Sequence, residues 1–170
     1  QVTLHRKADL TELLKFRKEL KAKVHTPLEN GELGITTLLT KAVTKALRDF
    51  PALNAWYGGG IHQIQERIHI GMATALDDGL VVPVIRDADR MTLADLGQSI
   101  KTLANKLEKV HFHLTYIVVL LLNYEPRGPG VEYFTPILNS PEVAILGVGA
   151  TQQALAFNEE ERLFKKTIFH

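Results

Sequence analysis

Seven histidines are the first candidates for chemistry in this sequence, because imidazole titrates near neutral pH and is the most frequent general base. His111 and His113 are two residues apart, which on a strand would place both imidazoles on one face as possible metal ligands. No carboxylate or third histidine stands at a recognisable spacing from them, so we expect no metal site. Four others are expected to be ordinary strand-surface or solvated residues: His5, His25, His62 and His69.

Three other groups have residue types that enzymes use, and each has a simpler interpretation. Gly58–Gly60 lacks the lysine of a P-loop and the spacing of a dinucleotide fingerprint, so a hairpin turn is expected. Asp87 and Asp89 could present two carboxylates, but acids in turns more often bond to the loop itself. Ser99 and Ser140 are expected in a helix and a proline turn, and no G-x-S-x-G motif occurs. Residue chemistry alone therefore leaves the function open.

Length and composition limit the classes of protein further. The 170 residues carry 45% apolar side chains, enough for one domain with a sizeable core, and the net charge of +1 indicates no nucleic-acid partner. With no cysteine, disulfides, thiolate zinc sites and a cysteine nucleophile are excluded. The apolar run Tyr116–Leu122 is too short to cross a bilayer, and Gln1–His5 does not resemble a signal peptide. We expect a soluble domain whose two ends, both in strand-like sequence, are cuts in a longer polypeptide.

Three helices are predicted to position any site. One begins at Asp9–Glu12, which has the spacing of a capping box, and a second is expected to be capped by Thr36 and ended by Pro51. Thr92–Asp95 predicts the start of the third, because leucine and isoleucine recur after it at helical spacing. All three patterns are amphipathic, which is typical of helices that cover one face of a sheet.

Strands are predicted in groups between these helices, and a proline is expected at an edge or bulge. The expected strands are a short one at Val2–Leu4, one or two in Ile61–Ala75, Leu80–Ile85 after an Asp77–Gly79 turn, Thr115–Leu122, Val131–Thr135, Val143–Val148, and a last one after Asn158–Glu161. The proline is Pro83. Grouped strands with interspersed helices predict an α+β (mixed α/β) fold with a mixed sheet, in one domain over residues 1–170.

Six phrases, taken in order, carry a family resemblance over nearly the whole chain. They are Val2–Arg6 with Asp9–Leu13, Phe50–Ala55, Ile70–Ala73, Gly79–Asp89, Phe134–Asn139 and Pro141–Gly149. In this order they resemble the catalytic core domain of the dihydrolipoamide acyltransferases of 2-oxoacid dehydrogenase complexes. Pro141–Ala144 is more similar to the acetyl and branched-chain members than to the succinyl members.

The resemblance implies a chloramphenicol acetyltransferase-like fold, a mixed sheet flanked by helices, in a homotrimer with active sites between subunits. In the family, trimers assemble into cubic or dodecahedral cores. Each active site lies in a channel between subunits, which coenzyme A and a dihydrolipoyl group enter from opposite ends. A histidine in D-H-R-x-x-D-G removes the thiol proton, and a hydroxyl in T-I-S-N donates to the oxyanion. Such a base and such a preorganised donor are what acyl transfer to a thiol requires.

The sequence departs from the family at both catalytic motifs. The oxyanion strand reads Val118–Asn123, so Leu122 stands at the hydroxyl position, followed by Asn123, and the loop 124–130 is longer than usual. D-H-R-x-x-D-G does not occur, and Phe169 and His170 resemble only the approach to it. Either the chain stops at the motif, which makes His170 the matching base, or the motif is truly absent. We favour a chain that lacks its C-terminal end, although His170 could equally be an ordinary terminal residue.

The resulting hypothesis is an acyltransferase core that moves an acyl group, expected to be acetyl, between dihydrolipoamide and coenzyme A. Coenzyme A is then a substrate, the lipoyl group lies on a domain outside this chain, and no metal takes part. The expected partners are further copies of the chain and the 2-oxoacid dehydrogenase and dihydrolipoamide dehydrogenase components, in the cytoplasm or the mitochondrial matrix. The alternative is a non-catalytic oligomeric scaffold or binding homologue, which Leu122 and the missing motif favour.

Overall fold

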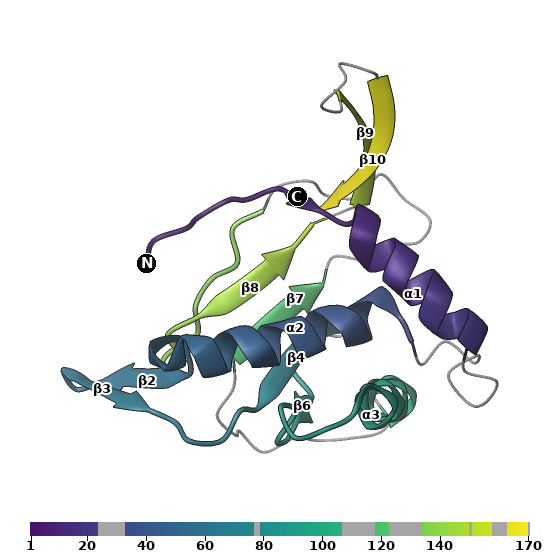
Figure 1. The fold of residues 1–170 in the computed structure, drawn as a ribbon. Helices are drawn as coiled ribbons and strands as arrows, with labels where there is room; N and C mark the ends of the chain where they lie inside the picture. The colour runs from purple at the N-terminus through teal and green to yellow at the C-terminus, as the bar shows by residue number, and fades with distance from the viewer. Residues whose placement is uncertain are drawn as a thin grey trace.

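Three helices and a central mixed sheet make up the body of the molecule, with two ribbons projecting from it (Figure 1). The computed structural model describes residues 1–23, 33–76, 79–106, 118–122, 134–149, 151–157 and 163–169. The α+β class with a mixed sheet flanked by helices is therefore confirmed. Within the part described, no helix is long and apolar enough to cross a membrane.

The central sheet has the strand order β5-β4-β7-β8, and β6 also pairs with β4. Its strands are β4 (Ile70–Leu76), β5 (Gly79–Val81), β6 (Val84–Ile85), β7 (Val118–Leu122) and β8 (Ile145–Val148). β5 and β6 run antiparallel to β4, whereas β7 is parallel to both of its neighbours. β7 therefore lies inside the sheet, with β4 on one side of it and β8 on the other.

The helices cover one another and the sheet. They are α1 (Thr11–Lys23), α2 (Ile35–Asp49) and α3 (Leu93–Lys106), and a short 3-10 turn, η2, follows α2 at Pro51–Leu53. In Figure 1 α2 lies across β4 and β7, with α3 beside it. Seven buried residues from α2, α3, the sheet and its loops form the core: Leu47, Ile68, Ile70, Ile85, Ala88, Leu96 and Val148.

Two antiparallel ribbons lie outside the central sheet. β2 (Ala55–Gly58) and β3 (Ile61–Ile64) form a hairpin whose turn holds Gly59 and Gly60 at positive φ, so the expected glycine turn is confirmed. β1 (Ala8–Asp9), β9 (Thr151–Phe157) and β10 (Leu163–Phe169) form the other, in the order β1-β10-β9. In Figure 1 β9 and β10 stand out from the body above α1.

Several helix and strand predictions are confirmed. Thr92 and Asp95 form a capping box at α3, because the Asp95 amide donates to Thr92 Oγ1 at 3.2 Å and the Thr92 amide to Asp95 Oδ2 at 3.3 Å. Ile61–Ala75 contains two separate strands. Pro83 lies between β5 and β6, where its missing amide costs no ladder bond.

Two local predictions are wrong, and one strand was missed. Val2–Leu4 is no strand but part of an extended arm, residues 1–7. Of the expected strand Val131–Thr135, residues 131–133 lie outside the described residues, and residues 134 and 135 are in no strand. The N-cap of α2 is Gly34 rather than Thr36, with no side-chain cap bond. β9 was not predicted, because its mixed polar sequence resembles a loop; it is held by seven paired positions on β10.

Candidate functional site

The end of β7 is the place at which the resemblance locates the oxyanion donor. Leu122 is the last residue of β7 and is paired with Val148 of β8 in a parallel register. Its backbone therefore lies at the C-terminal edge of the sheet, a common place for ligand binding in open mixed sheets. Asn123 and His170, the other two predicted site residues, lie outside the described residues, as do His111 and His113.

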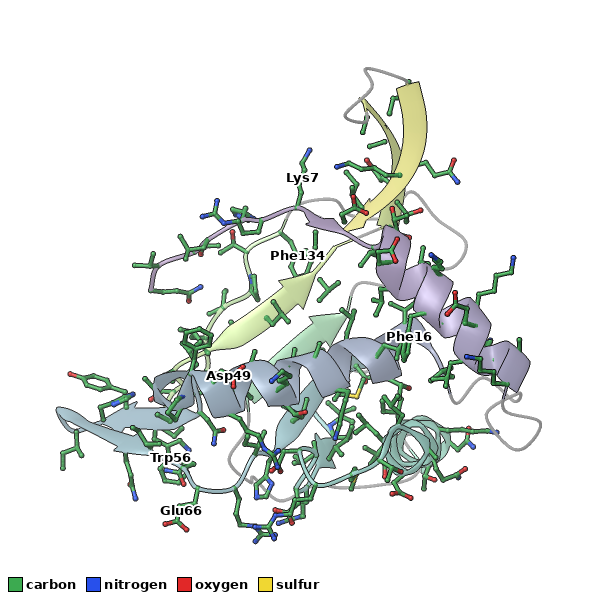
Figure 2. The ribbon with its side chains drawn as sticks, viewed as in Figure 1. Lys7, Phe16, Asp49, Trp56, Glu66 and Phe134 are labelled. Carbon is green, nitrogen blue, oxygen red and sulfur yellow. The ribbon has the colours of Figure 1, made fainter. Side chains whose placement is uncertain are left out.

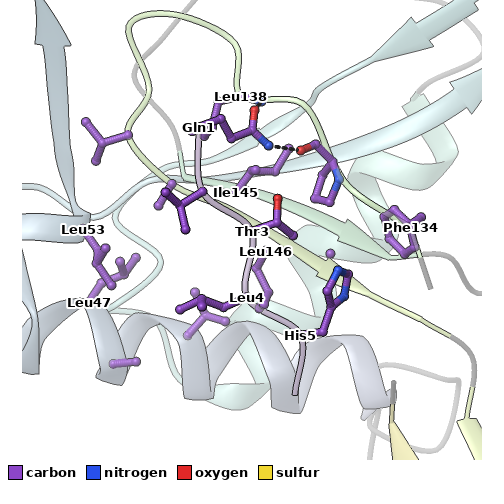
Figure 3. A pocket seen from close by; sticks show the side chains of 17 residues that line it. Gln1, Thr3, Leu4, His5, Leu47, Leu53, Phe134, Leu138, Ile145 and Leu146 are labelled. Atoms are coloured by element: carbon purple, nitrogen blue, oxygen red, sulfur yellow. Dashed lines mark hydrogen bonds between the residues drawn. The ribbon is translucent and has the colours of Figure 1, made fainter. Parts of the chain in front are cut away.

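A pocket of about 490 Å³ runs along β8 (Figure 3). Its floor includes Ile145–Gly147, and Gly147 is paired with Leu121, the residue before Leu122. Val43 and Leu47 of α2 and Leu53 of η2 form one wall, and the N-terminal arm with the 134–138 segment forms the other. A pocket of this volume is within the usual range for small-molecule sites.

The shape of the pocket depends on close packing of Phe134 over a glycine. A Cβ built on Gly147 would lie 2.9 Å from Cζ of the Phe134 ring and 3.2 Å from Cγ of Pro136. Only a residue without a side chain lets the 134–138 segment approach β8 this closely. The glycine therefore helps to form the pocket wall that adjoins the end of β7.

The arm is fastened to that wall by its first side chain. Gln1 Nε2 donates to the carbonyl of Pro136 at 2.6 Å, and the amide of Leu138 donates to Gln1 Oε1 at 3.1 Å. Figure 3 shows the bond from Gln1 to the carbonyl of Pro136, with the arm passing over the pocket as far as His5. One side chain thus supplies both bonds that a paired strand residue would supply from its backbone.

The pocket is almost uncharged in its side chains. No Asp, Glu, Lys or Arg is among the described residues that line it, and its polar side chains are Gln1, Thr3 and His5. An uncharged, elongated group with a few polar atoms fits such a lining, whereas a phosphate or carboxylate would find no cationic side chain there. His5 is the only described titratable side chain in the lining, and it is exposed.

The two carboxylates after β6 form ion pairs with arginines of other segments, rather than the expected bonds within their own loop. Asp87 forms a two-bond ion pair with Arg67, with 2.8 Å between Arg67 Nε and Asp87 Oδ1, and Asp89 Oδ2 lies 2.9 Å from Arg48 on α2. The hydrogen bonds from Arg67 hold the pKa of Asp87 below its usual value. Because the two acids face different partners, they do not form an acid and base pair.

His69 differs from its prediction as an exposed strand residue, because it is 7% exposed. Its Nδ1 accepts a bond from the amide of Asp87 at 3.0 Å, which places the proton of the neutral ring on Nε2. Burial lowers the pKa of His69, with the charge of Asp87 acting in the opposite direction. The imidazole therefore stays neutral and serves the turn. A histidine before a buried strand gives no sequence signal that separates this role from surface exposure.

Glu142 was missed by the sequence reasoning. It lies between Pro141 and Val143, just before β8, and its Oε2 is buried with no hydrogen-bond partner among the described residues. Burial raises its pKa to about 7. Among the residues described, no group of three potential ligands could hold a metal ion.

The chain is similar to known proteins over almost its whole length. Residues 1–169 match the family model described as 2-oxoacid dehydrogenases acyltransferase (catalytic domain). The acetyltransferase component of the acetoin cleaving system of Bacillus subtilis is 37% identical over 95% of this chain. The succinyltransferase component of the 2-oxoglutarate dehydrogenase complex of the same organism is 35% identical over 99% of the chain. The chain spans about 40% of the length of each relative.

Solved structures agree with the sequence matches. A dihydrolipoamide acetyltransferase of Azotobacter vinelandii, studied for the catalytic roles of a serine, a histidine and an asparagine, has a TM-score of 0.84 at 31% identity. A chain from the cubic core of a pyruvate dehydrogenase multienzyme complex has a TM-score of 0.83 at 30% identity. Both matches cover 99% of this chain and 69% of the other.

Proposed function

Because this chain belongs to the 2-oxoacid dehydrogenase acyltransferase family, we propose that it moves an acyl group between dihydrolipoamide and coenzyme A. The observation that carries the proposal is the family match over residues 1–169, in a fold whose β7 ends beside an uncharged pocket. That lining suits the uncharged parts of both substrates, which are long chains with a few amide groups and a terminal thiol.

The proposed reaction is a thioester exchange. A base removes the thiol proton, the thiolate attacks the carbonyl carbon of the acyl thioester, and the tetrahedral oxyanion collapses with loss of the other thiolate, which takes up the proton. We assign the base to His170 as a candidate, by its place after Phe169 at the end of β10. Both thiols come from the substrates, so the absence of cysteine from the sequence agrees with the scheme.

Leu122 leads us to expect a low rate of acyl transfer in this scheme. Leucine has no donor at the position where the family places a hydroxyl, and loss of one such donor typically costs about 10²–10³ in kcat. We therefore expect slow transfer by the natural protein and a rise of about 10²-fold in kcat, with little change in KM, for Leu122→Ser. The measurement is acetyl transfer from acetyl coenzyme A to dihydrolipoamide.

Leu122→Val is the matched control, because it changes the packing at the end of β7 without adding a hydroxyl. Rates that rise equally in both variants would show that a hydroxyl at this position is not what transfer lacks. Absence of transfer in every variant of a well-folded assembly would contradict the catalytic proposal itself.

For the acyl group, we propose acetyl rather than succinyl. The relatives named above include enzymes of both kinds, so identity alone does not decide between them. A succinyl group carries a free carboxylate that an acetyl group lacks, and the described lining offers no lysine or arginine to pair with it. Competition between acetyl and succinyl coenzyme A is the test, with a preference for acetyl expected.

The alternative function is a non-catalytic scaffold, and the leucine at position 122 is the observation that favours it. Either function implies a homotrimer, which a solved relative in a cubic core supports. We propose that the partners are the 2-oxoacid dehydrogenase and dihydrolipoamide dehydrogenase components, with the lipoyl group on a separate domain. The bacterial relatives favour a cytoplasmic location over the mitochondrial matrix.

A further inference from the structure

Glu142 lies where the 134–144 segment meets the β2–β3 hairpin, and the acyl-transfer scheme makes no use of it. Its backbone forms an isolated antiparallel bridge with Trp56, and its amide donates to the carbonyl of Asn139 at 3.0 Å. The amide of Tyr57 donates to the carbonyl of Pro141 at 2.8 Å. These bonds attach the hairpin to the body, and a two-stranded hairpin has little stability of its own.

The side chain of Glu142 is poorly suited to a charge. Its Oε2 is buried and has no hydrogen-bond partner among the described residues, so no donor there compensates a charge on that oxygen. Burial is the cause of its raised pKa, about 7.

In the described part of the chain, the segments bonded to Glu142 carry few other titratable groups. Glu142 is the only charged residue of 134–148, and the hairpin carries Tyr57 and His62. His62 is exposed, with its Nε2 3.1 Å from the carbonyl of Ala52. The terminal Gln1 contacts the segment at Pro136 and Leu138 through its side chain.

We propose that Glu142 is a proton-dependent latch between the 134–144 segment and β2, which is closed when the carboxyl is neutral and released when it ionises. A carboxyl whose pKa is higher in the folded contact than in water stabilises the contact fully below its ordinary value, 4.5. This stabilisation is lost as the pH rises through about 7. The latch is therefore closed in mild acid and open in mild base.

The latch also joins two walls of the pocket. Val143 and Ala144 follow Glu142 directly and line the pocket from one side, and Leu53, just before β2, lines it from another. Release of the latch thus loosens the pocket. Regulation of acyl transfer by this route rests on the proposed function, whereas the latch itself does not.

Trp56 allows a direct test, because it is the only tryptophan in the chain and is bridged to Glu142. We expect its fluorescence to change in one transition near pH 7 when the natural protein is titrated from about pH 5 to about pH 9. Glu142→Gln should abolish this transition. Glu66→Gln, which alters an exposed carboxyl after β3, should keep it (Figure 2).

If the fluorescence of Glu142→Gln shows the same transition, the proposal is overturned and the titrating group is a histidine. His62→Gln checks that assignment, and we expect this variant to keep the transition. If Glu142→Gln does not fold, infrared spectroscopy of the natural protein decides. At about pH 6 ordinary carboxyl groups are ionised, so a neutral carboxylic acid band that disappears above pH 7 is expected. Its absence overturns the latch. Neither measurement depends on acyl transfer, so inactivity of the enzyme would leave both outcomes readable.

Discussion

At the scale of single residues, the turn after β6 shows how charge and backbone conformation are combined. Asp87 has a φ of 51°, in the left-handed region that aspartate tolerates better than most residues. Its side chain pairs with Arg67 while its amide donates to His69. The turn is therefore held by an ion pair and by a neutral imidazole, which depend on pH in different ranges.

Because of His69, we expect the folded protein to lose stability in mild acid. Because burial lowers its pKa in the folded protein, its contribution to the free energy of unfolding is complete above the unfolded value of 6.5 and declines as the pH falls. The charge of Asp87 partly opposes the lowering, so Asp87→Asn should lower the pKa of His69 further. Titration of the imidazole by NMR measures this. The exposed His62 serves as the internal control, and a rise in the pKa of His69 would contradict the account.

At the scale of elements, the packing of the 134–138 segment on β8 determines the wall of the pocket. A Cβ added to Gly147 would lie 2.9–3.2 Å from the ring of Phe134 and from Pro136. A Cβ added to Gly58 in β2 would have no heavy atom within 4 Å. The two glycines are both in strands, so they form a matched pair for testing close packing. Only one of them is required by its neighbours.

We expect Gly147→Val to lower the free energy of unfolding by about 1–3 kcal/mol, because the added side chain overfills a packed contact. Gly58→Val should be neutral or stabilising, since valine favours strands and meets no neighbour there. Urea unfolding of both variants is the measurement. Adding Phe134→Ala to Gly147→Val should recover part of the loss, and strictly additive losses would show that the ring is not the obstacle.

Periodic elements could be predicted from the sequence, and contacts between distant segments could not. The pattern around Thr92 identified the α3 cap, and the unbroken apolar run identified β7 as a strand. Gln1, in contrast, binds Pro136 across 135 positions, and Glu142 forms a backbone bridge with Trp56. Neither contact leaves a local pattern. The position of Leu122 came from resemblance, since a leucine in an apolar strand has no chemical signal of its own.

At the scale of the whole molecule, the β9–β10 ribbon is the feature that a single copy does not explain. It stands out from the body in Figure 1, and β9 alternates between half-buried and exposed residues, with Leu155 63% exposed on the outer face. A projecting two-stranded ribbon with an apolar outer residue is stabilised when another surface covers it. In the proposed homotrimer, that surface belongs to a neighbouring copy.

Leu155→Glu should therefore weaken the trimer. A buried leucine is worth about 1.5–3 kcal/mol, which corresponds to a rise of roughly 10- to 100-fold in the dissociation constant, and the added charge increases the loss. Gln153→Glu introduces the same charge on the same face without removing an apolar side chain, so it should have the smaller effect. Light scattering across a dilution series measures both variants. A natural protein that is monomeric at micromolar concentration, or a trimer indifferent to Leu155→Glu, would place the contact between copies elsewhere, because an interface that buries Leu155 must respond to its loss.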